Sequence, residues 1–75
     1  MSDLPSFKPD RLLKALERAG FFVHHVSGSH YVLKHPARPH VRVVVPHHGG
    51  DVKRGVLRSI LRQAELTVEE LNRLL

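Results

Sequence analysis

The residues best suited to chemistry are the tripeptide Gly28-Ser29-His30. Glycine tolerates a positive φ and leaves the backbone open to close approach by a phosphate. Serine adds a small hydroxyl donor, and histidine transfers protons near neutral pH. Cleavage of RNA by attack of the 2′-hydroxyl on the adjacent phosphorus requires a base, an acid and a cation. The tripeptide therefore suits RNA chemistry, and a hairpin turn followed by an exposed strand histidine is the alternative interpretation.

A second histidine-bearing segment is Pro46-His47-His48-Gly49-Gly50-Asp51. We expect this loop to come near the end of the strand that begins at His30. There His48, or else His47, would serve as a second acid or base or as a phosphate ligand. The alternative is a solvated loop in which Asp51 helps to start the next helix.

Cationic residues gather at the start of the second predicted helix, at Lys53 and Arg54. Arg54, Arg58 and Arg62 recur every four residues, which aligns three guanidinium groups beside the apolar stripe of the helix. With the free N–H groups at the start of the helix, they predict a phosphate-binding edge, and Lys34 is a further candidate ligand. Such an edge suits double-stranded RNA, which is recognised mostly through phosphates and 2′-hydroxyls. An ordinary solvated helix face is the alternative.

Hydrophobic periodicity predicts the elements that would position these residues. The first helix begins at Pro9 and stops at Gly20, and the second runs from about Lys53 to Ala64. Thr67 and Glu70 predict a capping box for a short third helix. The predicted strands cover residues 21–26, 30–34 and 40–45, separated by a turn at 27–29 and a break at 36–39.

The order of elements predicts an α+β fold with an α-β-β-β-α core. Two amphipathic helices would cover one face of a three-stranded antiparallel sheet and leave the other face open. Alternation predicts which side chains share each face. The face toward the helices would hold Phe21, Val23, Tyr31, Leu33, Val41, Val43 and Val45, and the open face His24, His30, Val32, Lys34, His40 and Arg42. The 75 residues would form one domain, with a loose arm over residues 1–7 and the folded part over residues 8–75.

Composition limits the classes of function. Lysine and arginine outnumber aspartate and glutamate by 12 to 7, which favours polyanionic partners such as nucleic acid. There is no cysteine, so disulfides, thiolate metal sites and thiol catalysis are excluded, and a reducing cytoplasm is expected. No signal pattern or membrane-spanning run is expected. Histidines at 24, 25, 47 and 48 lack the usual ligand spacing, and neighbours on a strand point to opposite faces, so we expect no metal.

The combination of these motifs resembles the HicA (YcfA-like) family of toxins from bacterial and archaeal toxin–antitoxin modules. The resemblance covers roughly residues 8 to 75. It is carried by the Gly-Ser-His turn, by the P-x-H loop from Pro46 to His48, and by the K-x-G-x-L-R-x-I-L helix from Lys53 to Leu61. Two positions depart from the family pattern. Val56 replaces the usual threonine, and Glu65 replaces the usual glycine, at a cost of about 1 kcal/mol in a left-handed helix cap.

The resemblance implies a double-stranded-RNA-binding-domain-like fold and a ribonuclease that cleaves messenger RNA and arrests translation. It implies that His30 is the essential catalytic residue and that the partner is a HicB antitoxin that masks the active site. It implies no metal or organic cofactor.

Three hypotheses follow for the function of the chain. The first is a toxin ribonuclease in which His30 is the general base or acid and Lys34, Lys53 and Arg54 hold phosphate, with Gly28 and Ser29 at the RNA. The second is a non-catalytic double-stranded-RNA-binding module. The third is a protein-interaction domain whose basic sheet face meets an acidic partner.

Overall fold

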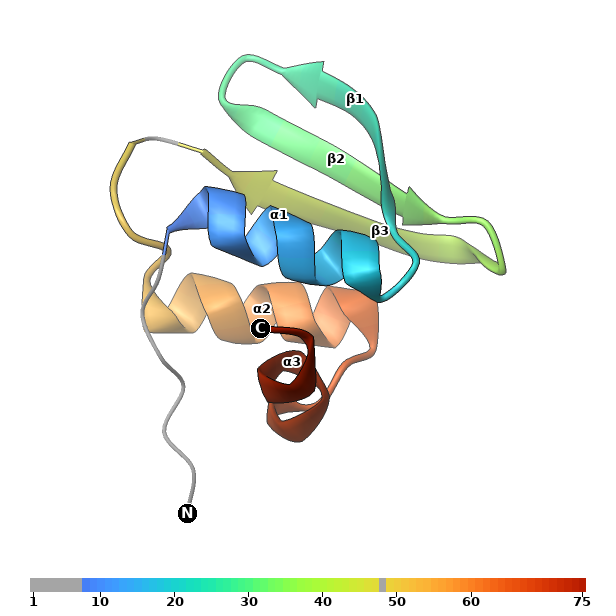
Figure 1. Cartoon of the computed structure of the whole chain (residues 1–75). Coiled ribbons are helices and arrows are strands. Elements are labelled where there is room, and N and C mark those ends of the chain that lie inside the picture. Colours follow the sequence, from blue (N-terminus) through green and yellow to red (C-terminus); the bar gives the residue numbers. More distant parts are fainter. Residues whose placement is uncertain (1–7, 48) are drawn as a thin grey trace.

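The computed structural model describes residues 8–47 and 49–75, in the order helix, three strands, helix, helix (Figure 1). The elements are α1 (Pro9–Arg18), β1 (Phe22–Ser27), β2 (His30–His35), β3 (Arg38–Pro46), α2 (Arg54–Ala64) and α3 (Val68–Leu74). This confirms the predicted α+β class and the double-stranded-RNA-binding-domain-like order, with a short third helix. The arm predicted for residues 1–7 lies outside the described residues.

The two longer helices end in the same backbone arrangement. After α1, the N–H groups of Gly20 and Phe21 donate to the carbonyls of Glu17 and Leu16, both at 3.0 Å. Gly20 takes a φ of +102°, a conformation that side chains rarely adopt, so the predicted stop is confirmed. After α2 the left-handed position is filled by Glu65, with φ 60° and ψ 39°. The left-handed cap is therefore kept without a glycine.

Helix α3 begins with the predicted capping box. The Thr67 hydroxyl accepts a hydrogen bond from the Glu70 N–H at 3.1 Å, and the Glu70 carboxylate accepts one from the Thr67 N–H at 2.9 Å. These bonds from Thr67, and then the nearby Arg73 and Arg38 guanidinium groups, hold the pKa of Glu70 below its ordinary value of 4.5. The ionised carboxylate thus stabilises the start of a helix that is only seven residues long.

The sheet is antiparallel in the order β1-β2-β3, so β2 has a neighbour on both sides. Its register shifts between Val23 and His25 in β1, where His24 forms a bulge. A second shift lies between Lys34 and His35, opposite the start of β3. There β3 begins at Arg38, two residues earlier than predicted, and contains Pro39. Because proline has no N–H to donate, it lies where the ladder is irregular.

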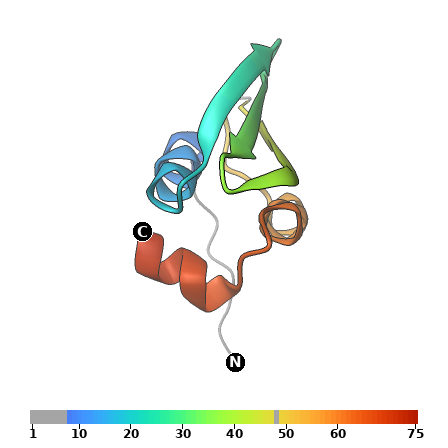
Figure 2. The same ribbon diagram turned by 90° about the vertical axis from the view of Figure 1, so that its right-hand side faces the viewer.

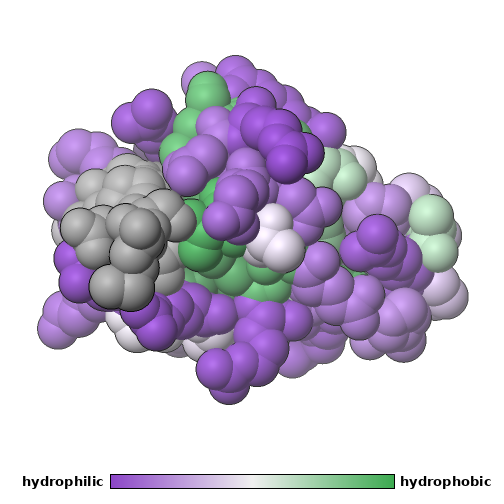
Figure 3. Space-filling view, turned by 90° about the horizontal axis from the view of Figure 1, so that it is seen from below, coloured by the Kyte–Doolittle hydropathy of each residue, from purple (hydrophilic) through white to green (hydrophobic). Residues whose placement is uncertain are grey.

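The hydrophobic core lies between the helices and one face of the sheet (Figure 2). Helix α2 also follows the outer edge of β3, where the Gln63 side-chain carbonyl accepts from the Val44 N–H at 3.0 Å. The view from below shows a narrow hydrophobic strip near the centre, framed by hydrophilic residues (Figure 3). None of the helices in the described part of the chain combines the length and hydrophobicity needed to cross a membrane. The core contains Leu12, Leu13, Ala15, Leu16, Phe21, Leu33, Val41, Val43, Val45, Val52, Leu57, Ile60, Leu61, Ala64 and Leu71.

The predicted faces are correct for β2 and β3 but not throughout β1. Because of the bulge, His25 pairs with Val32 on the open face, and its ring lies beside that of His24 instead of pointing away from it. Val23 pairs with the fully buried Leu33 as predicted, yet it is 38% exposed, since β1 lies at the side of the sheet away from α2 (Figure 1). Val32 lies on the open face but is only 3% exposed. The open face of the sheet therefore also contains a buried apolar side chain.

Candidate functional site

The turn that carries the candidate catalytic histidine is a two-residue hairpin loop. Ser27 pairs with His30, which leaves Gly28 and Ser29 as the loop. Gly28 has a φ of +59°, and Ser29 has a negative one. A positive φ at the first loop residue alone is the pattern of a type II′ turn, which is matched to the twist of a hairpin. A Cβ at Gly28 would meet no atom within 4 Å, so the turn is open to an approaching group.

His30 is mounted on the end of the central strand. It is the first residue of β2 and is exposed, with Ser27 of β1 on one side and Pro46 of β3 on the other. Two hydrogen-bonded neighbours hold its backbone firmly, which suits a group that must meet a reacting atom. Residues at alternate positions share a face, so Val32 and Lys34 lie on the same side of β2 as His30. Lys34 pairs with Arg42, which places two cations further along that open face.

His47 is tied to the same end of the sheet by three contacts. Its backbone N–H donates to the Ser29 carbonyl at 2.7 Å, and its Nε2–H donates to the Asp10 carboxylate at 2.7 Å. Its ring lies 5.2 Å from the Tyr31 ring, at 32° to it. Tyr31 pairs with Val45 on the face of the helices, so the His47 ring lies on the side opposite to His30. Asp10 and Tyr31 were not among the predicted site residues, and the only sequence signal for this cluster was the continued alternation of β3 beyond Val45, which places His47 on the face of Tyr31.

The cationic candidates are brought together only in part. Lys53 lines a hollow together with Pro46, which pairs with His30, so Lys53 lies near the hairpin turn. Arg54 begins α2 directly after Lys53, and no described side chain caps this start. Arg58 and Arg62 are exposed but lie about 6 and 12 Å further along the helix axis. Lys34 is four residues from His30 along an extended strand, roughly 13 Å between Cα atoms.

His48, the candidate second acid or base, lies outside the described residues. Neighbouring strand histidines were expected to point apart, but the bulge in β1 brings the Nδ1 atoms of His24 and His25 to 2.9 Å from each other, so this expectation was wrong. Among residues 8–47 and 49–75, no three histidine, aspartate or glutamate side chains gather as metal ligands.

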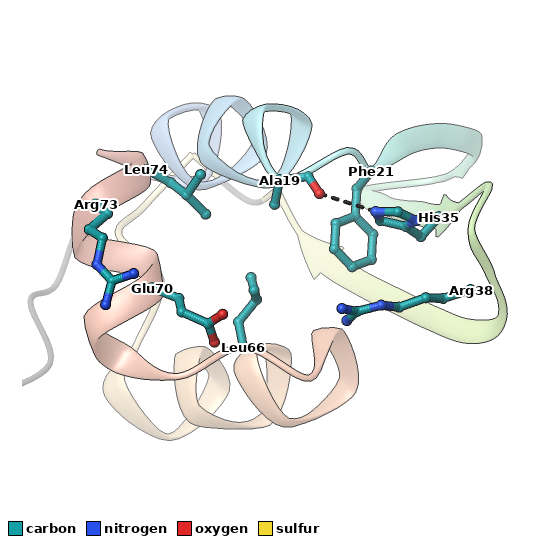
Figure 4. A pocket seen from close by; sticks show the side chains of 8 residues that line it. All are labelled: Ala19, Phe21, His35, Arg38, Leu66, Glu70, Arg73 and Leu74. Atoms are coloured by element: carbon teal, nitrogen blue, oxygen red, sulfur yellow. Dashed lines mark hydrogen bonds between the residues drawn. The ribbon is translucent and has the colours of Figure 1, made fainter.

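Another hollow, of about 330 Å³, lies at the other end of the sheet, beside the turn between β2 and β3 (Figure 4). Its histidine, His35, has a structural role. Nδ1 accepts from the Ala37 N–H at 3.1 Å, so Nε2 carries the proton and donates to the Ala19 carbonyl at 3.1 Å. The ring also meets Phe21 edge to face at 5.0 Å. Nε2 therefore holds the end of α1 against the sheet, and Nδ1 holds the turn between β2 and β3.

Comparison with known proteins identifies the family. The model of a protein family described as "HicA toxin of bacterial toxin-antitoxin" matches residues 9–66. The chain belongs to the HicA toxin family. No curated protein matches it. The match confirms the resemblance and includes the hairpin turn, the loop after β3 and the whole of α2.

Membership of the HicA family makes the chain a toxin of a toxin–antitoxin module, and so implies an antitoxin partner. The two residues that depart from the HicA family pattern, Val56 and Glu65, lie at the two ends of α2. Glu65 adopts the left-handed conformation itself, and its carboxylate lies 3.2 Å from His40 Nε2 and 3.6 Å from the Arg38 guanidinium group. Val56 is 36% exposed and lies on the first turn of α2. Neither residue is part of the hairpin turn.

Proposed function

We propose that this HicA toxin is a metal-independent ribonuclease that cuts messenger RNA and arrests translation in the cytoplasm, with His30 as its catalytic residue. The observation that carries the proposal is the position of His30. The side chain is exposed at the end of the central strand, directly after an open glycine turn. It also lies across from Pro46, whose loop leads to the cationic start of α2.

The reaction that suits these residues is transfer within the RNA strand. The 2′-oxygen forms a bond to phosphorus, the bond from phosphorus to the 5′-oxygen breaks, and a 2′,3′-cyclic phosphate and a 5′-hydroxyl result. His30 takes the proton of the 2′-hydroxyl or delivers one to the leaving 5′-oxygen. His48 is our candidate for the other proton transfer.

The negative charge that develops on the phosphoryl oxygens needs fixed cations nearby. Lys53 lines the hollow beside Pro46 and Arg54 follows it in the chain, while the open space at Gly28 leaves room for the phosphate beside Ser29. Lys34, about 13 Å along the strand, would instead hold a neighbouring nucleotide. Arg58 and Arg62, on successive turns of α2, would bind phosphates further along the RNA.

The antitoxin partner is, in this proposal, a HicB-type protein that covers the end of the sheet at His30. RNA and antitoxin would then compete for one surface. Adding the purified antitoxin should abolish cleavage in proportion to the complex formed. Cleavage that continues when all of the toxin is bound would place the antitoxin elsewhere.

The direct test is incubation of the purified protein with end-labelled RNA in the presence of a metal chelator. We expect fragments with cyclic-phosphate and 5′-hydroxyl ends. RNA that is retarded on a gel but remains intact would instead favour a non-catalytic double-stranded-RNA-binding module. If RNA does not bind even at low salt, where phosphate contacts are strongest, the protein-interaction hypothesis is favoured.

A further inference from the structure

A hollow of about 330 Å³ lies between the end of β3, the following loop and the first turn of α2. Its lining consists of Pro46, Gly50, Asp51, Val52, Lys53 and Val56. Pro46, Val52 and Val56 give it apolar walls, while the charged side chains belong to the exposed residues Asp51 and Lys53. The volume is at the lower end of the range for small-ligand pockets, roughly 300 to 1,000 Å³.

The position of this hollow relates it to His30. Pro46 is directly opposite His30 in the ladder between β2 and β3, so their Cα atoms are about 5 Å apart. Paired residues on neighbouring strands point to the same face, which for this pair is the open face of the sheet. A chain whose phosphate lies at His30 would therefore have its adjacent sugar and base within reach of the hollow.

The lining fits a flat, mostly apolar group with a polar edge. Proline and valine side chains contact the faces of a ring without needing hydrogen bonds, whereas a phosphate buried against them would lose its hydration uncompensated. At the rim, the Asp51 carboxylate accepts from an amino group and the Lys53 ammonium group donates to a phosphate or a carbonyl oxygen. A nucleobase attached to a sugar phosphate has all of these features.

We propose that this hollow binds one nucleobase of the RNA beside the scissile phosphate and that Val56 forms its outer wall. The inference rests on the proposed ribonuclease function and adds to it a subsite for a base. Val56 is suited to this role because it is 36% exposed at the pocket, whereas Val52 is only 4% exposed and belongs to the core.

The test uses the methyl resonances of Val52 and Val56 in the full chain. We expect nucleoside monophosphates to shift these signals through ring currents, and ribose 5-phosphate, which has no base, to leave them nearly unchanged. Val56→Phe fills the hollow and should weaken nucleotide binding about tenfold. Val26→Phe is the matched control, since Val26 is also an exposed valine, 51% exposed, but lies on β1 and does not line the hollow. Val26→Phe should bind nucleotides like the parent.

The outcomes separate this inference from the ribonuclease proposal. Equal shifts with ribose 5-phosphate and with nucleotides would overturn the base subsite, because the phosphate alone would account for them. Unshifted valine methyls in a protein that does cut RNA would also overturn it and leave the ribonuclease proposal standing. Base-dependent shifts that Val56→Phe weakens would support the subsite even if the parent left RNA uncut, and only the ribonuclease proposal would then fail.

Discussion

The substitution Gly20→Ala tests how the end of α1 is built against the sheet. At Gly20 the φ is +102°, and a Cβ would lie 2.6 Å from His35 Nε2, well inside ordinary contact. The His35 ring would have to move. It would then lose its hydrogen bonds to the Ala19 carbonyl and the Ala37 N–H.

The expected cost follows from these contacts. A side chain in a left-handed conformation costs about 1 to 2 kcal/mol. The two hydrogen bonds contribute about 1 kcal/mol each. Alanine restricts the unfolded chain and recovers roughly 0.5 kcal/mol. The sum is a destabilisation of about 3 kcal/mol, which lowers Tm by roughly 12 to 24 °C in a domain of this size.

The matched control is Gly28→Ala. Gly28 also has a positive φ, +59°, but its Cβ would meet nothing within 4 Å. Only the backbone strain of about 1 kcal/mol remains there. Urea unfolding of both variants, and of Gly20→Ala in a His35→Ala background, separates strain from contact. If Gly20→Ala costs no more than Gly28→Ala, or costs as much without His35 as with it, the reasoning is refuted.

Three further predictions concern charged residues. Because the pKa of Glu70 is lowered in the folded state, its ionised form stabilises the fold above the ordinary value of 4.5, and this contribution is lost as the pH falls through the lowered value. Glu70→Gln should therefore be less stable than the parent near neutral pH and approach it in acid, as followed by urea unfolding; a gap that is independent of pH would contradict this. Asp10→Asn should lower stability by less than about 1 kcal/mol, since Asp10 is 78% exposed, but should reduce RNA cleavage by loosening the hold on His47. The test measures the cleavage rate and Tm of Asp10→Asn, with Glu69→Gln as the control. Equal cleavage rates for the two variants would contradict this prediction. Arg58→Ala should weaken RNA binding equally for all sequences and reduce the slope of log affinity against log salt by about 0.9, whereas an unchanged slope would mean that Arg58 contacts no phosphate.

Most of the fold could be predicted from the sequence because its signals are local. Pro9 and Gly20 mark the ends of α1, and the Thr67–Glu70 pair marks the start of α3. What could not be predicted was the bulge at His24, because a bulge depends on how two strands fit together. One extra residue there puts His25 opposite Val32 and brings the rings of His24 and His25 together on one side. The early start of β3 was missed for a related reason, since Pro39 is compatible with a strand only where the ladder is irregular.

The candidate site was predictable only in its local part. The open turn at Gly28 follows from glycine chemistry, and the left-handed cap at Glu65 from the position of the helix end. The tie between His47 and Asp10 joins residues 37 positions apart, and no periodic pattern indicates it. The hollow beside Pro46 likewise combines a strand end, a loop and a helix start, so it exists only after folding.

The measurement that tests the central claim most directly is RNA cleavage by a purified His30→Ala variant. Loss of a general acid or base lowers rates about 10²- to 10⁴-fold, and because His30 is exposed the variant should keep the fold and Tm of the parent. His40→Ala is the matched control, since the His40 side chain is 67% exposed and lies before the core-facing part of β3. We predict that His30→Ala is folded and fails to cut RNA, while His40→Ala cuts at the parental rate. A folded His30→Ala variant that cuts RNA as fast as the parent would contradict the account.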